Sequence, residues 1–133
     1  MQAWSLRDQT TKYEIKHGGA VSDFVVGQKR SPLANRIVLI GSDKACWISN
    51  KKTGGVVAKV QLDSFCRSLT VDRNETVIVV GTADNKVTFI NTTTFKIVKQ
   101  VTLDALIDSL AFNHLNDTLL AVSGTGQVYS FKF

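Results

Sequence analysis

The sequence predicts an all-β fold built from a repeated unit of short antiparallel strands. The stretch Val57–Leu69 recurs 41 residues later as Val98–Leu110. The identical pairs at this offset are Val57 and Val98, Val60 and Val101, Leu62 and Leu103, Asp63 and Asp104, Ser68 and Ser109, and Leu69 and Leu110. The other segments are short apolar runs between turn-forming residues, and none has the apolar spacing of a long amphipathic helix. A repeat of about 40 residues made of short strands is typical of β-propeller blades.

The predicted strands follow a regular order, labelled a to d from the centre of the propeller outward. The chain begins with a c strand at 2–6 and a d strand at 12–16. A first whole blade has its a to d strands at 20–26, 36–40, 45–49 and 55–62. A second has them at 65–71, 76–80, 86–91 and 96–103, and a third set has a, b and c at 106–112, 118–122 and 127–131. The single domain 1–133 therefore divides into outer strands of a first blade (1–17), two blades (18–63 and 64–104) and an incomplete last blade (105–133).

The apolar pattern of these strands supports the same arrangement. The b strands Ile37–Ile40 and Val77–Val80 are apolar without alternation, as expected where both faces of a sheet are covered. The d strand Val56–Leu62 alternates, which indicates a partly solvated outer position. The b–c links are short and contain Gly or Asn, residues that tolerate the positive φ angles of tight hairpins. Stacked blades account for this gradient from inside to outside.

The composition is that of a globular protein, with 44% apolar and 20% charged residues. No apolar run approaches the length of a transmembrane helix. The first residues lack the charged and apolar regions of a secretory signal. Cys46 and Cys66 lie in apolar strands without metal-binding spacing, which predicts buried, reduced thiols. We expect an intracellular protein, cytoplasmic or nuclear, without a membrane partner.

The predicted blades are too few to close a ring. Closed propellers have about 4–8 blades, whereas this chain has about three and its last set lacks a d strand. An open stack exposes strand edges and an apolar blade face. We therefore expect a segment of a larger propeller, or a chain that completes its ring with another chain or a second copy.

No group of residues predicts catalysis, a metal site or a cofactor. The two histidines, His17 and His114, lie beside predicted turns without a spaced partner. The stretch Lys51–Gly55 lacks the residue order of a phosphate-binding loop and precedes a strand, so it predicts a hairpin turn. The aromatic residues of the c strands are expected to pack between blades. We do not expect an enzyme.

The c strands and b–c turns resemble those of the WD-repeat family of propellers. Where that family ends strand c with Trp-Asp, this chain has Trp4-Ser5, Ile48-Ser49, Ile90-Asn91 and Phe131-Lys132. The family's Asp in the b–c turn is matched by Asp84, and Asp43 is one residue out of place. The Gly-His pair before strand a is echoed by His17-Gly18, and Asp63 and Asp104 occupy this region in later blades. The chain is thus similar to a divergent WD-repeat propeller that cannot form the family's Asp–His–Ser/Thr–Trp hydrogen-bond network.

This resemblance implies a non-catalytic scaffold that binds protein partners within a larger complex. The surface it implies consists of the d–a and b–c links Lys16–Ala20, Asp63–Ser64, Asp104–Ala105, Gly41–Lys44 and Gly81–Asn85. The net charge of +5 adds two hypotheses, a ribonucleoprotein setting and an RNA- or anionic-ligand-binding module that acts through basic loops. The candidate partner-binding residues are Lys29, Arg30, Lys51, Lys52, His17, Asp43, Asp63, Asp84 and Asp104.

Overall fold

The described part of the chain consists of β-strands joined by loops. The computed structural model describes residues 2–4, 12–14, 21–41, 43–113 and 118–132, and of residues 2–4, 12–14, 21 and 22 the backbone alone. The strands are β1 (Gln2–Trp4), β2 (Lys12–Glu14), β3 (Val21–Val26), β4 (Arg36–Gly41), β5 (Ala45–Asn50), β6 (Val56–Gln61), β7 (Cys66–Val71), β8 (Val77–Thr82), β9 (Lys86–Asn91), β10 (Ile97–Thr102), β11 (Ile107–Phe112), β12 (Thr118–Ser123) and β13 (Val128–Lys132).

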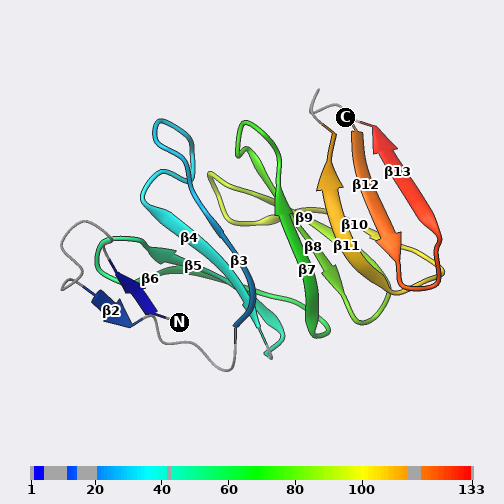
Figure 1. The fold of residues 1–133 in the computed structure, drawn as a ribbon, viewed down its shortest axis with the longest axis horizontal. Coiled ribbons are helices and arrows are strands. Elements are labelled where there is room, and N and C mark those ends of the chain that lie inside the picture. The colour runs from blue at the N-terminus through cyan, green and yellow to red at the C-terminus, as the bar shows by residue number, and fades with distance from the viewer. Residues whose placement is uncertain (1, 5–11, 15–20, 42, 114–117, 133) are drawn as a thin grey trace.

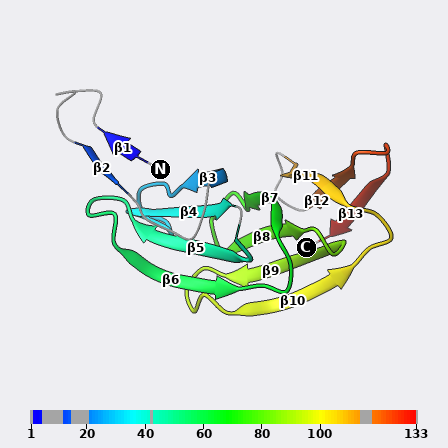
Figure 2. The same ribbon diagram turned by 90° about the horizontal axis from the view of Figure 1, so that it is seen from below.

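These strands form three antiparallel sheets, named blades 1 to 3 here, and a separate hairpin. Blade 1 has the strand order β3-β4-β5-β6, blade 2 has β7-β8-β9-β10, blade 3 has β11-β12-β13, and β1 pairs with β2. The blades lie side by side in chain order, with the β1–β2 hairpin beside blade 1 (Figure 1 and Figure 2). The innermost strands contact one another across blades, β3 against β7 and β7 against β11. The predicted all-β, propeller-like stack of blades is confirmed, and the proposed division of the chain at residues 17, 63 and 104 stays a prediction.

The core lies in two layers between the blades. In β8, Ile78 packs in the layer between blades 1 and 2, and its neighbour Val79 packs in the layer between blades 2 and 3. One apolar run supplies both layers because successive side chains of a strand point to opposite faces. In the second layer Phe89 and Phe131 meet edge to face with their ring centroids 6.2 Å apart. These two c-strand aromatics therefore pack between blades as predicted.

The repeat recurs in the backbone geometry. Each innermost strand carries a β-bulge after its first residue, at Ser22, Arg67 and Asp108. Asn85 and Gly126 lie 41 residues apart in equivalent b–c links and have φ angles of 64° and 94°. These left-handed positions confirm the predicted tight turns, which Gly and Asn adopt at little cost.

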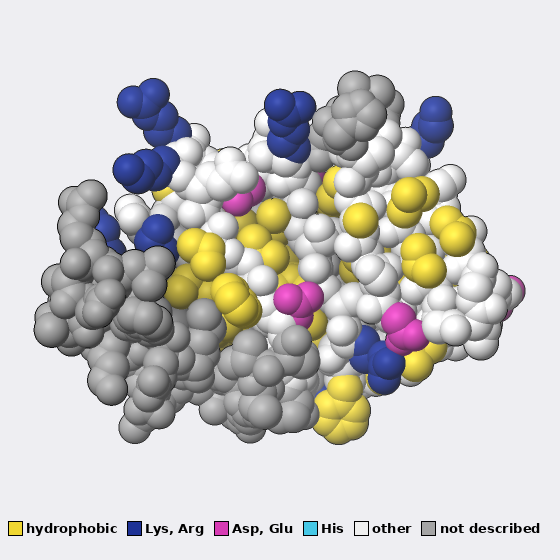
Figure 3. Space-filling view, viewed as in Figure 1, with side chains coloured by type: hydrophobic (Ala, Val, Ile, Leu, Met, Phe, Trp, Pro, Cys, Tyr) yellow, Lys and Arg dark blue, Asp and Glu magenta, His cyan; other side chains and the backbone are white. Residues whose placement is uncertain are grey.

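The outer face of blade 3 has no covering sheet among the described residues. Strand β8 of blade 2 is buried on both faces. Its equivalent β12 buries Leu119 and leaves Leu120 37% exposed. Val128 in β13, the edge strand of this sheet, is 61% exposed. Figure 3 shows hydrophobic side chains gathered over β12 and β13, so the blade stack is open on this side.

The antiparallel order places the loops of each blade at two opposite ends of its strands. The a–b and c–d links lie at one end, named the a–b end, and the b–c and d–a links lie at the other, named the b–c end. The loops β3–β4 and β7–β8 of the a–b end form the upper edge of Figure 1. Loop residues can share a surface only when their links belong to the same end.

Candidate interaction surfaces

The structure separates the predicted partner-binding residues into two sets. Lys29 and Arg30 lie in the β3–β4 loop, and Lys51 and Lys52 lie in the β5–β6 turn, so all four belong to the a–b end. Figure 3 shows Lys and Arg side chains along the corresponding upper edge. His17 lies outside the described residues. The four aspartates belong to the b–c end, in the b–c links (Asp43 and Asp84) and the d–a links (Asp63 and Asp104).

The β3–β4 loop holds its two cations in a defined backbone conformation. Leu33 is fully buried in the core layer between blades 1 and 2 and anchors the loop. The chain passes so close to itself that a Cβ on Gly27 would lie 1.7 Å from the Leu33 carbonyl oxygen. Arg30 adopts a left-handed conformation with a φ of 63°. The loop therefore presents Lys29 and Arg30 outward from a buried anchor.

Glu75 in the β7–β8 turn ties this loop to blade 2. Its carboxylate is buried and accepts hydrogen bonds from the Gln28 N–H, at 3.0 Å, and from the Ser31 hydroxyl. Its carbonyl oxygen accepts a hydrogen bond of 2.7 Å from Thr92 Oγ1 in the β9–β10 turn. Three links of the a–b end are thus bound together through one residue.

The β5–β6 turn joins Lys51 and Lys52 to the same loop. The Lys51 N–H donates to the Asn35 carbonyl oxygen at 2.8 Å. Asn50 Oδ1 accepts from the Lys52 N–H at 2.8 Å, which confirms the predicted hairpin turn. The equivalent turn of blade 2, at 91–96, repeats this asparagine-capped geometry with threonines in place of the lysines. The four predicted cations therefore lie on two connected links of one blade.

The described acids at the a–b end of the three blades are buried and hydrogen-bonded. Asp72 is 7% exposed, and its Oδ1 accepts from the Thr76 N–H at 2.6 Å and the Val77 N–H at 3.0 Å. Glu75 is 2% exposed and is engaged by the β3–β4 loop. Further cations at this end are Arg36, Arg73, Lys96 and Lys132. This end therefore presents cations without an exposed carboxylate among its described residues.

At the b–c end of blade 2, Lys86 joins two of the predicted aspartates. Its Nζ lies 3.3 Å from Asp63 Oδ2 and 3.6 Å from Asp84 Oδ2. The hydrogen bond to Asp63 and the charge of Asp84 raise the pKa of Lys86. An ion-paired lysine thus connects the d–a and b–c links. In this region the chain lacks the residues that form the Asp–His network of WD-repeat propellers.

The other two aspartates accept hydrogen bonds from aromatic side chains. Asp43 Oδ2 accepts a hydrogen bond of 2.7 Å from Trp47 Nε1, and Lys59 Nζ lies 4.8 Å from the centroid of the same ring. Asp104 Oδ1 accepts a hydrogen bond from the Tyr129 hydroxyl, which raises the pKa of Tyr129. All four predicted aspartates therefore make contacts that hold links to strands.

An exposed aromatic ring and a pocket mark the b–c end. Phe65 in the d–a link is 51% exposed, and Lys44 Nζ lies 5.3 Å from its ring centroid. Two residues further on, Arg67 Nη2 forms an ion pair of 2.8 Å with Asp108 Oδ1 of blade 3. Both side chains line a pocket of about 370 Å³ between blades 2 and 3. These residues form a surface that has apolar and charged parts.

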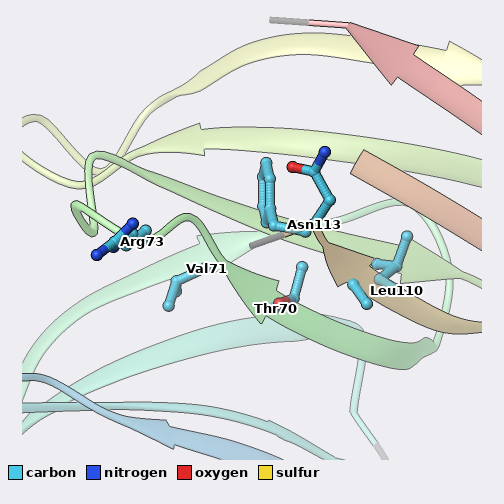
Figure 4. A pocket seen from close by; sticks show the side chains of 7 residues that line it. Thr70, Val71, Arg73, Leu110 and Asn113 are labelled. Carbon is cyan, nitrogen blue, oxygen red and sulfur yellow. The ribbon is translucent and has the colours of Figure 1, made fainter. Parts of the chain in front are cut away.

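A second pocket lies between the innermost strands of blades 2 and 3 at the a–b end. It measures about 680 Å³ and is lined by the ends of β7 and β11. Figure 4 shows Thr70 and Val71 on one side, Leu110 and Asn113 on the other, and Arg73 at one end. The a–b end therefore has a hollow between the innermost strands of blades 2 and 3.

The two cysteines are free and buried, as predicted. Desolvation raises the pKa of both thiols, that of Cys66 to about 12. No three potential metal ligands come together within the described ranges. The same residues include no helix long and apolar enough to cross a membrane.

Comparison with known proteins identifies the fold. No family model and no curated protein matches the sequence. The structure is similar to the crystal structure of the WD40 β-propeller domain of Doa1, with a TM-score of 0.78 and 18% sequence identity. The match covers 92% of this chain and 40% of that chain. The chain therefore has the fold of part of a WD40 β-propeller, which confirms the predicted divergent, partial WD-repeat architecture.

The predicted set of partner-binding residues did not include Phe65, Glu75 or the cations outside blade 1. Phe65 has an apolar counterpart in the repeat, Leu106, and that similarity alone suggests a core position. Glu75 occupies an ordinary polar turn, and the sequence holds no sign of its contact with a loop 44 residues away. Arg73 and Lys96 could have been found, because the predicted strand order already places their links beside those of Lys29 and Lys51.

Proposed function

We propose that this chain is part of a non-catalytic protein-interaction scaffold and that it contacts a protein partner through the b–c end. WD40 propellers generally serve as such scaffolds. The observation that carries the proposal is Phe65, an aromatic side chain in a d–a link of the b–c end that is 51% exposed. Exposed aromatic rings that enter a partner's pocket often supply much of the binding energy of an interface.

The surroundings of Phe65 define the partner's chemistry. Lys44 Nζ lies over the ring, and Arg67, Asp104 and Asp108 line a pocket at the same end of the strands. The partner segment that fits this surface places an apolar side chain against Phe65 and basic or amide groups toward the two carboxylates. Complex formation of this kind needs no catalytic residue.

The test is Phe65→Ala, because the phenyl ring lies outside both core layers and its removal leaves the fold intact. Val98→Ala, at an outer-strand position that is 66% exposed, is the matched control. Tagged versions of the chain are expressed in their native cells, cross-linked and quantified by mass spectrometry. Recovery of specific proteins should fall at least about tenfold with Phe65→Ala and stay unchanged with Val98→Ala. If both variants recovered the same proteins in the same amounts, the proposal that this surface contacts the partner would be wrong.

We also propose that a further propeller blade covers the outer face of blade 3. Leu120 and Val128 are exposed there, whereas the equivalent side of β8 is buried by blade 3 itself. The solved WD40 propeller is longer than this chain, which spans 40% of it. The ring would therefore be completed by blades outside these 133 residues.

Sedimentation velocity of the isolated chain tests this second part. An uncovered apolar face should cause association, and Val128→Lys should reduce it because a buried lysine opposes sheet stacking. A folded, monodisperse monomer would contradict the proposal, and a defined dimer would show that a second copy takes the place of further blades.

We propose that the scaffold lies inside the cell, in the cytoplasm or nucleus. Its two free, buried cysteines support this location, because thiols stay reduced in intracellular compartments.

A further inference from the structure

We propose that the a–b end is a binding surface for the phosphate backbone of a nucleic acid. This surface lies at the opposite end of the strands from Phe65, so it does not depend on the proposed protein contact. Three features of the described residues carry the proposal: the absence of exposed carboxylates from the a–b end, the fixed backbone of the links that carry its cations and the chemistry of the surface around them.

Exposed carboxylates are distributed unequally along the strand direction. Among the residues that the structure describes in the three blades, the exposed acids lie in the b–c end or in the adjoining half of an innermost strand; they are Asp23, Asp63, Asp104 and Asp108. The a–b end has only the buried acids Asp72 and Glu75 among its described residues. Its cations come from all three blades: Lys29, Arg30, Arg36, Lys51 and Lys52 from blade 1, Arg73 and Lys96 from blade 2, and Lys132 from blade 3. A field of one sign over one end attracts a polyanion from solution.

Four of the five cations of blade 1, Lys29, Arg30, Lys51 and Lys52, lie on links whose backbone is held in place. The Lys51 N–H hydrogen bond to the Asn35 carbonyl fastens the β5–β6 turn to the loop that carries Lys29 and Arg30. Glu75 fastens that loop to blade 2. Fixed backbones reduce the conformational entropy that binding removes, so these cations can contact an anion at a lower cost than cations on free loops.

The dimensions favour an extended anion over a single phosphate group. Packed sheets lie about 10 Å apart, so cations distributed over three blades cover a longer track than one phosphate can contact. A nucleic-acid backbone offers a charge at every nucleotide along such a track.

The surface chemistry favours a nucleic acid over an acidic protein. The exposed residues of the β3–β4 loop and the β7–β8 turn are polar or cationic, apart from Pro32. Protein interfaces usually have an apolar centre, whereas protein–nucleic-acid interfaces are more polar and much more positive. No exposed aromatic side chain lies in these two links, so binding through phosphates should depend little on base sequence.

Blade 2 supplies a conservative design for the test. Thr92 and Thr93 occupy the positions equivalent to Lys51 and Lys52 in the same type of turn. The double variant Lys51→Thr, Lys52→Thr therefore removes two charges and keeps a sequence that this turn already accepts. Lys44→Gln, Lys59→Gln removes the same charge away from the a–b end and is the matched control. Adding Lys29→Gln and Arg30→Asn to the first pair gives a quadruple variant, since Asn tolerates the left-handed conformation of Arg30.

The measurement is fluorescence anisotropy of labelled oligouridylate and of a labelled DNA duplex at salt concentrations from about 50 to 200 mM. The unmodified chain should bind at low salt and weaken steeply as salt rises. The quadruple variant should bind at least about tenfold more weakly, and its salt slope for the single strand should decrease by about 3, because about 0.7 is lost for each phosphate contact. Circular dichroism and thermal unfolding of each variant show that the fold is kept.

Three outcomes would overturn the proposal: no binding by the unmodified chain at low salt, equal losses in the two double variants, or competition by polyglutamate as effective as that by unlabelled oligonucleotide. The third would assign the surface to an acidic protein. Comparison of the two probes tells a single strand from a duplex. Phe65→Ala should bind both probes normally, so failure of this proposal is distinguishable from failure of the protein-interaction proposal.

Discussion

Arg67 and Asp108 occupy equivalent positions in neighbouring blades and form an ion pair with each other. Both are bulge residues of innermost strands, 41 residues apart. Arg67 Nη2 lies 2.8 Å from Asp108 Oδ1. The bulge re-aims each side chain out of the regular alternation of its strand. The repeat thus places opposite charges where two blades meet.

This ion pair should contribute little to stability. Its side chains are 45% and 41% exposed, and exposed pairs typically contribute about 0.2–1 kcal/mol. A double-mutant cycle of Arg67→Ala and Asp108→Ala, measured by urea unfolding, should give a coupling energy in that range that decreases with added salt. A coupling energy well above 1 kcal/mol would show that the pair stabilises blade stacking.

Glu75 should be a major stabilising residue of the a–b end. Glu75→Ala leaves the Gln28 N–H without its side-chain acceptor and removes one of the two acceptors of the Ser31 hydroxyl, the other being the Gln28 carbonyl oxygen, so the free energy of unfolding should fall by about 1–3 kcal/mol. Glu75→Gly loses the same hydrogen bonds but removes the strain of a left-handed residue with a φ of 56°. It should therefore be about 1 kcal/mol more stable than Glu75→Ala. Equal stability of the two variants would show that the backbone strain is negligible.

Leu33 should be essential to the β3–β4 loop despite its position in a polar segment. It is fully buried, and Leu→Ala at such sites costs about 2–5 kcal/mol. Exposed Val98→Ala should change the free energy of unfolding by less than about 0.5 kcal/mol. Thermal and urea unfolding of both variants check this contrast. A loss at Leu33 no larger than that at Val98 would mean that the loop does not depend on its anchor.

Stability should decrease at alkaline pH because of the two cysteines. Burial raises the pKa of Cys46 and brings that of Cys66 to about 12, whereas an unfolded thiol ionises near pH 8.5. The folded state therefore holds protons that the unfolded state releases. This stabilising contribution is complete below pH 8.5 and is lost as the pH rises from there toward 12, at up to about 1.4 kcal/mol per pH unit for each thiol.

Urea unfolding between pH 7.5 and pH 10 measures this loss. Cys66→Ala should make the slope of the free energy of unfolding against pH less steep than in the unmodified chain, by the equivalent of about one proton released on unfolding. Lysines and tyrosines also titrate in this range, so the difference between the two proteins is the relevant quantity. An unchanged slope would assign the alkaline loss to those other groups.

The blade architecture could be predicted because local patterns report burial. The apolar run Val77–Val80 without alternation indicates a strand covered on both faces, and the structure places Ile78 and Val79 in different core layers. The open side could be anticipated from the number of blades. The exposure of Leu120 could not, because its sequence position is equivalent to that of the buried Val79.

The candidate surfaces were predicted only in part. Lys29, Arg30, Lys51 and Lys52 were identified as basic pairs, yet the hydrogen bond between Lys51 and Asn35 joins two links that the sequence shows only as separate. The aspartates were identified in the correct links, but their contacts with Lys86, Trp47 and Tyr129 depend on how the links approach the strands.

By itself, the sequence determined the repeat, the strand type and the tight turns, because hydrophobic alternation and the need for positive φ act over a few neighbouring residues. Only the tertiary structure decided which cations share a surface, which acids are buried and which aromatic ring is exposed. Those properties depend on pairs such as Glu75 and Ser31, which are 44 residues apart and come together only when two blades pack. No local pattern encodes such a contact, because burial of a loop residue is set by the neighbouring blade.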